Sequence, residues 1–495
     1  MFAMLRSVAL FQVCLAGAGL LLAQSPPAAV NPAVKRIVDE ISQERIAANL
    51  RKFEGFGTRY ILSSDADPVH GIGAARRWIY GEFKSYSPKL EVSYQTFRVR
   101  KGARRGQVLR EVELSNVVAI LPGTVDRDRY VLVTAHYDTV NLHRKPQFTD
   151  AERVADLVKR GTDEAEAQRV IQLFPTVDTI GDVDNEATAA ETISPGVTDD
   201  GSGTAAVMEL ARVMSQYQFK KTLVFMAFAG EEIGLEGSKA YAAMAKQKGM
   251  QIEAVLNNDI IGSDTAGNGR VNNSTLRVFS DGPEDSPGRA LLRYTKLMAE
   301  RYVPSMHVEM VFHADRFNRG GDHTSFVTQG YAGVRLTTPN ENYENQHTAT
   351  DTYTNTSASY TTRVTRMNAA TLASLALAPP PPVVNYTYQS GERKGDRSPM
   401  LSRGKSGYDA ALRWQPSTAP DIAGYALVIR ATTAPDWERE IWVGNVTSYT
   451  MPDVSIDDIV IGVKAVDRDG NQSLVSAYLE PVTQQLTAPP ASPKE

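Results

Sequence analysis

Along residues 30–378, segments whose apolar residues recur at helical spacing alternate with apolar segments typical of strands. Apolar residues recur at helical spacing in VKRIVDEISQERIAANLRKFE (34–54), with a break at Ser42 to Glu44. Further helices are expected from Gly71, over 289–300 and over 361–377. The segments that predict strands are 90–99, 113–123, 130–138, 222–232, 253–262, 307–312 and 332–338. This alternation of strands and helices predicts an α/β sandwich with a largely parallel sheet.

The pattern changes at a run of prolines. Residues 379–384 contain this run, and we interpret them as a semi-rigid linker. From 385 to 483, short strand patterns such as GYALVIRA and IVIGVKAV are separated by turn residues, without a helical pattern between them. This segment predicts an all-β, immunoglobulin-like sandwich. The placement of Trp414, Tyr425 and Tyr449 resembles that in a fibronectin type III domain.

The two ends of the chain are expected to lie outside the folded domains. Residues 1–23 combine Arg6 with an apolar run and a following polar turn, which is typical of a secretory signal peptide. They predict a secreted or periplasmic protein, and no later apolar run is long enough to span a bilayer. The single cysteine, Cys14, lies in this segment, so disulfides and thiolate chemistry are not expected in the mature chain. Residues 484–495 are expected to be disordered.

Composition excludes one class of partner. The formal net charge is −4, so there is no basic excess, and a nucleic-acid-binding role has no electrostatic support. Residues 141–195 are mostly charged and helix-prone, and we interpret them as an inserted flap. In the C-terminal segment, Asp467 to Asn471 begins like a calcium loop but lacks the glutamate at the twelfth position, which favours a β-turn.

Five residues at strand ends, or in the loops that follow them, are of types that bind metal ions. Because an open α/β sheet binds ligands at the carboxyl ends of its strands, we expect these residues to converge there. Two imidazoles and three carboxylates, with no thiolate, suit zinc. Asp199 lies in a glycine-rich turn, and we hypothesise that it bridges two ions and leaves positions for water and substrate. The five residues are His136, Asp199, Glu232, Asp259 and His347.

Each of these residues alone has a plainer interpretation. His136 could be a buried core histidine, and Asp199 with Asp200 could be an acidic pair at a helix N-terminus. Glu231 and Glu232 directly follow an apolar strand, where adjacent side chains point in different directions. One of the two glutamates can therefore bind a metal ion while the other faces water.

Three further acids are expected to support the site. Asp138 would orient His136, and Asp351 would orient His347. Asp322 and His323, in RGGDHTSF, form a rival ligand pair, which we interpret as structural support rather than as direct ligands.

The motifs, taken in order, resemble a known family. H-x-D, G-x-x-DD-x-SG, EE-x-G-x-x-GS, ND, GGDH and H-T-x-x-D follow one another over residues 35–375. This set resembles the co-catalytic zinc peptidases of clan MH, which include bacterial leucyl aminopeptidases and glutamate carboxypeptidases. The resemblance implies a zinc peptidase domain over 30–378. It also implies a three-layer sandwich around a mixed, mostly parallel sheet, and two zinc ions per chain.

The resemblance also assigns roles to the five ligands. Asp199 would bridge the two ions, His136 and Asp259 would complete one site, and Glu232 and His347 would complete the other.

Glu231 would be the general base of such a peptidase. The chain departs from the compact members of the family in the long insertion before Asp199 and in Gln346, which stands where a tyrosine is usual. Tyr343 is a candidate to replace that tyrosine as a hydrogen-bond donor to the transition state.

Several functions follow from this resemblance. We expect an aminopeptidase that acts on peptide substrates. A glutaminyl cyclase with a single zinc, a dipeptidase or carboxypeptidase, and a receptor-like binding protein without activity remain alternatives. The C-terminal β-sandwich is a candidate for contact with a polymer or a protein. No G-x-S-x-G motif supports a serine hydrolase.

Overall fold

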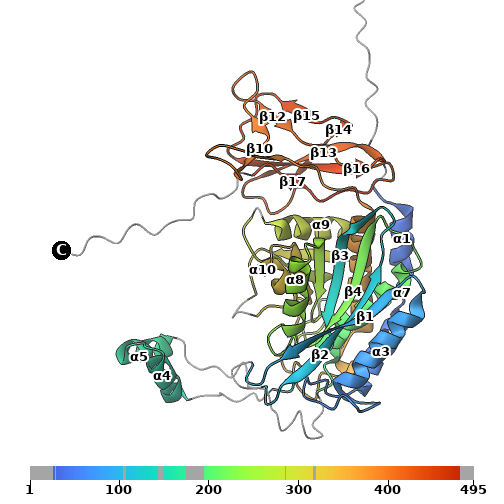
Figure 1. Ribbon diagram of the computed structural model, residues 1–495, viewed down its shortest axis with the longest axis vertical. Coiled ribbons are helices and arrows are strands. Elements are labelled where there is room, and N and C mark those ends of the chain that lie inside the picture. Colours follow the sequence, from blue (N-terminus) through green and yellow to red (C-terminus); the bar gives the residue numbers. More distant parts are fainter. Residues whose placement is uncertain are drawn as a thin grey trace, which may run out of the picture.

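The computed structural model describes residues 26–479, except 28, 104–107, 143–148, 174–193, 285 and 316–318. The expected signal peptide (1–23) and C-terminal tail (484–495) lie outside the described residues. An α/β unit is followed along the chain by a group of small β-sheets (Figure 1). No helix in the described ranges is both long enough and apolar enough to cross a membrane.

An eight-stranded mixed sheet forms the centre of the α/β unit. Its strands, in spatial order, are β1 (Glu91–Val99), β2 (Val112–Leu121), β4 (Lys221–Phe228), β3 (Asp126–His136), β5 (Gln251–Asn258), β8 (Gly333–Thr337), β6 (Thr275–Phe279) and β7 (His307–Val311). The neighbours β4, β3, β5 and β8 run parallel to one another. The pairs β1–β2, β2–β4 and β6–β8 are antiparallel. The sheet is therefore mixed, with a parallel centre whose carboxyl ends share one edge.

Helices cover both faces of this sheet. The side chains of β4 show this division because they alternate between two apolar clusters. Leu223 and Phe225 belong to one cluster, and Val224 and Met226 belong to the other. On the first side lie α1 (Pro32–Asp39), α2 (Gln43–Gly55), α3 (Gly71–Tyr86), α7 (Ser202–Met214), α9 (Pro287–Tyr302) and α11 (Ala358–Leu377); on the second lie α8 (Glu236–Gln247) and α10 (His323–Thr328).

The predicted break after the first helix is confirmed, because a second helix begins there with its own N-terminal cap. Ser42 lies between α1 and α2, and its hydroxyl accepts the backbone N–H of Arg45. Among the main helices and strands of the α/β unit, the sequence did not predict β6, α8, or α10, which occupies part of an expected loop. In addition, β4 ends at Phe228, so Glu231 and Glu232 lie in the turn after the strand and not at its end.

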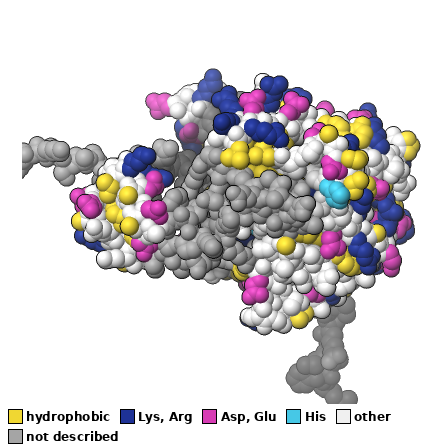
Figure 2. Space-filling model, turned by 90° about the horizontal axis from the view of Figure 1, so that it is seen from below, with side chains coloured by type: hydrophobic (Ala, Val, Ile, Leu, Met, Phe, Trp, Pro, Cys, Tyr) yellow, Lys and Arg dark blue, Asp and Glu magenta, His cyan; other side chains and the backbone are white. Residues whose placement is uncertain are grey.

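Two short helices lie within the segment interpreted as a flap. They are α4 (Asp150–Lys159) and α5 (Glu164–Leu173), which pack against each other. A capping box at Thr149 and Glu152 begins α4. The pair lies apart from the sheet in Figure 1, and residues 143–148 and 174–193 on either side are outside the described residues. Figure 2 shows acidic and basic side chains lying among one another on the face seen from below.

Antiparallel strands with a separate apolar core follow α11. They form sheets of two, three and four strands. The core includes Trp414 and Tyr425, whose ring centroids are 5.5 Å apart. The strands are β9 (Asn385–Thr387), β10 (Arg397–Pro399), β11 (Leu401–Ser402), β12 (Ala410–Arg413), β13 (Ile422–Ala431), β14 (Arg439–Gly444), β15 (Ser448–Met451), β16 (Ile459–Asp467) and β17 (Ser476–Ala477).

An ion-pair cluster joins these sheets to the α/β unit. Lys220, directly before β4, donates to Asp421 at 2.6 Å and to Asp467 at 2.8 Å. Asp467 also accepts the backbone N–H of Asn471, which closes the turn that began like a calcium loop. The ammonium group of Lys220 therefore supplies the positive charge beside these two acids. Asn471 in turn accepts a hydrogen bond from the side chain of Asn31, ahead of α1.

Candidate metal centre

The five expected ligands converge at the carboxyl edge of the parallel strands. His136 is the last residue of β3, and Asp259 directly follows β5. Asp199 lies in the turn Val197–Gly201, immediately before α7. Potential ligand atoms of His136, Asp199 and Asp259 lie within 4.8 Å of one another, and so do those of Asp199, Glu232 and His347. The two groups share Asp199.

The carboxylate of Asp199 lies between the two imidazoles. Its Oδ1 is 3.2 Å from Nε2 of His136, and its Oδ2 is 3.0 Å from Nε2 of His347. Nε2 of His347 is also 2.9 Å from Oε1 of Glu232. Because each oxygen of Asp199 faces a different histidine, one carboxylate can contribute to two adjacent ion positions.

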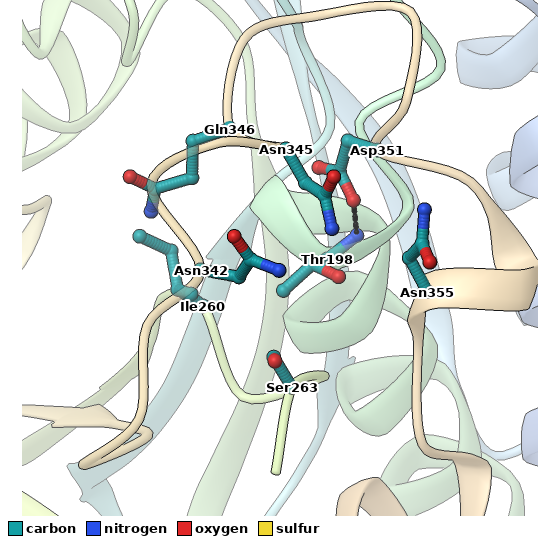
Figure 3. Close-up of a pocket in the computed structure, with 8 residues that line it drawn as sticks. All are labelled: Thr198, Ile260, Ser263, Asn342, Asn345, Gln346, Asp351 and Asn355. Carbon is teal, nitrogen blue, oxygen red and sulfur yellow. Dashed lines mark hydrogen bonds between the residues drawn. The ribbon is translucent and has the colours of Figure 1, made fainter. Parts of the chain in front are cut away.

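Asp351 holds the backbone of the Asp199 turn. Its two carboxylate oxygens accept the backbone N–H groups of Thr198, at 2.8 Å, and Asp199, at 3.0 Å. The bond to Thr198 is drawn in Figure 3. Asp351 was expected to orient His347, but these contacts go to the turn that carries the shared ligand. The turn has no helical ladder for these N–H groups, so the side-chain acceptors satisfy them.

Arg59 holds the same turn from the other side. This arginine is fully buried and donates to the carbonyl oxygens of Tyr137, Phe53, Pro195 and Gly196. Desolvation lowers the pKa of Arg59 to about 10, although nearby acids, including Asp351 and Asp138, oppose the shift. Arg59 therefore ties the segment after β3 to the start of the Asp199 turn.

The carboxylate of Asp200 links three backbone segments through hydrogen bonds. Its carboxylate accepts N–H groups from His136 and Ile260, each at 3.2 Å, and from Gly203 at 2.9 Å. These three amides belong to the end of β3, the loop after β5 and the first turn of α7. Asp200 thus fixes the spacing of the segments that carry His136, Asp199 and Asp259.

Asp138 supports the glutamate turn as well as His136. Its carboxylate accepts the backbone N–H of Glu231 at 3.1 Å and of Glu232 at 3.3 Å. Nδ1 of His136 lies closer to the backbone oxygen of Asp138, at 3.1 Å, than to the carboxylate, at 3.7 Å. An Nδ1–H that donates to this carbonyl leaves the lone pair of Nε2 directed at the Asp199 side.

Asp259 is paired with an arginine from the next strand. Oδ2 of Asp259 is 3.1 Å from Nε of Arg335 in β8, and Nη1 of Arg335 is 3.0 Å from Oδ2 of Asp315. All three residues are buried. Asp259 therefore has one oxygen engaged by Arg335, while its ligand group with His136 and Asp199 remains compact.

The electrostatics of the cluster favour bound cations. Burial raises the pKa of Glu231 and of Asp200 well above the ordinary carboxyl value. Burial opposes the charged form of His136, but its hydrogen bond to Asp199 and the charges of Glu231 and Asp200 outweigh this effect and raise its pKa. Several buried carboxylates thus compete for few positive groups. Oxygen and imidazole donors in such a setting fit zinc.

Asp322 and His323 face different surroundings. Asp322 is fully buried, and desolvation raises its pKa to about 7, with smaller contributions from Asp138 and Asp259. Nε2 of His323 is 3.4 Å from Oδ2 of Asp281. Asp322 thus belongs electrostatically to the ligand cluster, whereas His323 pairs with Asp281.

Tyr343 lies on the surface beside an arginine. Its side chain is largely exposed, its ring centroid is 5.6 Å from the guanidinium carbon of Arg319, and its hydroxyl is 3.4 Å from Nη1 of the same residue. Arg319 also pairs with Glu341 at 2.7 Å.

A small polar pocket adjoins the ligand cluster. Several residues that line it are direct chain neighbours of expected ligands: Thr198 precedes Asp199, Ile260 follows Asp259, and Gln346 precedes His347. Figure 3 shows the amide side chains of Asn342 and Asn345 directed toward Thr198, whereas the side chain of Gln346 points away from it. The loop that carries His347 therefore also forms a wall beside the cluster.

Arg59, Asp200 and Arg335 have larger structural roles than the sequence suggested. A signal existed for Arg335, because a charged residue inside the apolar strand AGVRLTT is buried only when it is paired. No comparable pattern marks Arg59, whose partners are backbone carbonyls from distant parts of the chain.

Comparisons with known proteins identify the family to which this chain belongs. Peptidase family M28 matches residues 116–372. A protein of Leptosphaeria maculans named "Probable zinc metalloprotease" is 32% identical over 471 residues, which cover 89% of this chain and 95% of that protein. One of the same name from Pyricularia oryzae is 34% identical over 469 residues, which cover 88% and 82%.

Two solved structures are also similar. The LapA aminopeptidase of Legionella pneumophila has 18% identity and a TM-score of 0.47, over 71% of this chain and 77% of that chain. A glutaminyl cyclase of Fimbriiglobus ruber has 18% identity and a TM-score of 0.47, over 70% and 97%. The family itself rests on the sequence matches, which cover most of the chain. The chain therefore belongs to peptidase family M28 and is a zinc metallopeptidase.

Proposed function

We propose that this zinc metallopeptidase is a di-zinc exopeptidase that removes N-terminal residues from peptides. One observation carries the proposal: the two oxygens of Asp199 face different histidines, His136 at 3.2 Å and His347 at 3.0 Å. A carboxylate placed in this way can be shared by two ions. His136 and Asp259 would complete one position, and Glu232 and His347 the other.

The bound ions would supply Lewis-acid chemistry, which acidifies water and polarises the substrate carbonyl. Glu231 supplies the proton transfer. Its side chain is mostly buried, its Oε2 is 4.0 Å from Nε2 of His136, and its backbone is fixed by Asp138. Burial raises the pKa of Glu231, which suits a group that must both take and return a proton.

The reaction balances with Glu231 as the only proton carrier. Water adds its oxygen to the carbonyl carbon of the scissile amide, and Glu231 accepts one proton from that water. The carbon–nitrogen bond then breaks, and Glu231 returns the proton to the leaving amine. Tyr343 is proposed to donate a hydrogen bond to the oxygen that gains charge in the transition state.

The alternatives differ in the number of metal ions and in the substrate end that is recognised. A glutaminyl cyclase would use one zinc, and the presence of both His136 and Asp259 beside Asp199 supports two positions. A dipeptidase or carboxypeptidase would share the same ligands but require a free carboxylate on the substrate. A binding protein without activity would not need Glu231 beside the ligands.

The remaining proposals concern location and the C-terminal part. We propose that residues 1–23 are a signal peptide and that the protein is secreted or periplasmic. The C-terminal sheets are proposed to be a fibronectin type III-like domain. In support, the hydroxyl of the core residue Tyr425 accepts the backbone N–H of Ser417 at 3.0 Å. Contact with a polymer or another protein through this domain is also a proposal.

Substrate profiling tests the proposed function. The purified protein would be assayed on aminoacyl-nitroanilides, on N-blocked peptides and on N-terminal glutaminyl peptides, with and without a chelator. Metal content would be measured on the same sample. We expect chelator-sensitive release from free N-termini, no cleavage of blocked peptides and two zinc ions per chain. Cyclisation of glutaminyl peptides with one zinc would replace the proposal with the cyclase.

A further inference from the structure

Asp259 differs from the other expected ligands in how its side chain is held. Its backbone N–H donates to Leu336 in β8 at 3.1 Å, and its Oδ2 is 3.1 Å from Nε of Arg335 in the same strand. The main chain and the side chain of Asp259 are thus both fixed by β8. The carboxylate torsion of an aspartate is otherwise broad, so this second contact selects its orientation.

Arg335 is itself rigidly placed. It is only 2% exposed, and its Nη1 is 3.0 Å from Oδ2 of Asp315. A buried guanidinium held by two carboxylates has little freedom to turn. Arg335 engages Oδ2 of Asp259 and so leaves Oδ1 as the oxygen that can face an ion.

Gly321 provides the space for this contact. A β-carbon at position 321 would lie 2.7 Å from Oδ2 of Asp259, 3.0 Å from Nδ2 of Asn257 and 3.3 Å from Cδ of Arg335. At the neighbouring Gly320, the nearest atom to an added β-carbon is Oγ1 of Thr324, at 3.3 Å. The absence of a side chain is therefore required at position 321 and much less so at position 320.

We propose that Arg335 and Gly321 are positioning residues for Asp259 and control the occupancy of one of the two metal positions. This inference rests on the proposed di-zinc ligand set. Partners that orient a metal ligand typically contribute about 10–100-fold in metal affinity. The ion held by His136 and Asp259 should therefore depend on both residues, whereas the ion held by Glu232 and His347 should not.

Two variants test the proposal in different ways. Arg335→Met removes the contact together with its charge, and it can impair folding because it leaves buried acids unpaired. Gly321→Ala changes no charge and displaces Oδ2 of Asp259 by steric contact alone. Matched controls are Arg277→Met, whose guanidinium pairs with Glu341 at 2.7 Å, and Gly320→Ala.

The readout is zinc binding to the full chain, measured by titration of the metal-free protein and by circular dichroism for folding. We expect zinc binding at the position of His136 and Asp259 to lose about 10–100-fold in affinity in both variants, and binding at the other position to stay within about threefold. Anomalous scattering from zinc-loaded crystals should show the remaining peak beside Glu232 and His347. Both controls should bind two ions as the unmodified protein does.

Other results overturn the inference. If folded Gly321→Ala protein binds two ions with unchanged affinity, or loses both equally, Arg335 and Gly321 do not act on one position. If the remaining peak lies beside His136, the assignment of positions is wrong. If the unmodified protein binds a single ion, the proposed di-zinc function fails along with the inference, whereas the first two results leave that function intact.

Discussion

Nε2 of His347 lies 3.0 Å from Oδ2 of Asp199, which joins the loop after β8 to the turn before α7. The other oxygen of Asp199 faces His136 at 3.2 Å. Among the described residues, Asp199 is the ligand shared by the group with His136 and Asp259 and the group with Glu232 and His347, and a third group joins His136 to Glu231 and Glu232. Loss of Asp199 should affect both ion positions.

Asp199→Ala should abolish zinc binding at both positions, because each loses a shared carboxylate. Zinc content after dialysis against metal-free buffer should fall from two ions per chain to none. Asp457→Ala, which removes an exposed acid in the loop between β15 and β16, is the control and should retain both ions. A variant at Asp199 that keeps two tightly bound ions would refute the bridging role.

Glu231→Gln should retain zinc and lose turnover. The amide keeps the size of the side chain but cannot accept the proton from water, so we expect kcat to fall by about 10²–10⁴-fold. Glu236→Gln, at the start of α8, is a matched control and should be close to the unmodified enzyme. Near-normal kcat in folded, zinc-loaded Glu231→Gln protein would exclude the assigned role.

Arg59→Met should destabilise the fold. The variant removes a buried cation that donates to four backbone carbonyls, and we expect a loss of about 3–5 kcal/mol in the free energy of unfolding. Urea unfolding in the presence of a chelator measures this effect without the contribution of bound metal. Arg51→Met, at an exposed arginine of α2 whose guanidinium carbon lies 4.3 Å from the ring centroid of Tyr353, should change stability by less than about 1 kcal/mol. Equal stability of the two variants would contradict the prediction.

Tyr343→Phe tests whether the hydroxyl of this exposed tyrosine takes part in the reaction. If the hydroxyl donates to the transition state, kcat should fall by about 10²-fold with little change in KM. Tyr386→Phe, at an exposed tyrosine of β9, should leave kcat unchanged. Unchanged kinetics for Tyr343→Phe would show that its hydroxyl does not act in the transition state.

Lys220→Met should loosen the C-terminal sheets from the α/β unit. It leaves Asp467, which is fully buried, without its ammonium partner, and we expect a cost of about 1–3 kcal/mol. Hydrogen exchange should increase around Asp421 and Asp467. Lys35→Met removes an exposed pair with Asp39 and should cost less than about 1 kcal/mol. Unchanged hydrogen exchange around both acids would show that the ion pairs of Lys220 are not needed to hold the C-terminal sheets.

The convergence of the five expected ligand residues was the most predictable part of the molecule. His136 and Asp259 end or follow strands whose apolar runs are easily recognised, and such strands place their ends together. The short strand β6 has five residues at the far side of the sheet and carries a weak pattern. Helix α10 has six residues and is separated by one residue from Gly320 and Gly321, two glycines that resemble a loop in sequence.

The supporting contacts were harder to foresee. Asp138 and Asp351 were expected to act on imidazoles, yet their carboxylates accept backbone N–H groups of neighbouring turns. Such acceptors are chosen by the local backbone path, which a sequence pattern does not describe. Arg59 is the extreme case, because all four of its acceptors are backbone carbonyls.

The position of Lys220 has a consequence for inheritance of the C-terminal sheets. Lys220 directly precedes the N-terminal end of β4, and Glu231 and Glu232 follow its C-terminal end. In a relative that lacks these sheets, a lysine at position 220 would have no acidic partners there. In a relative that keeps them, we expect acids at positions 421 and 467 to pair with that lysine. These three positions should therefore change together, so exchange of the C-terminal part between relatives should be best tolerated when residue 220 is exchanged with it.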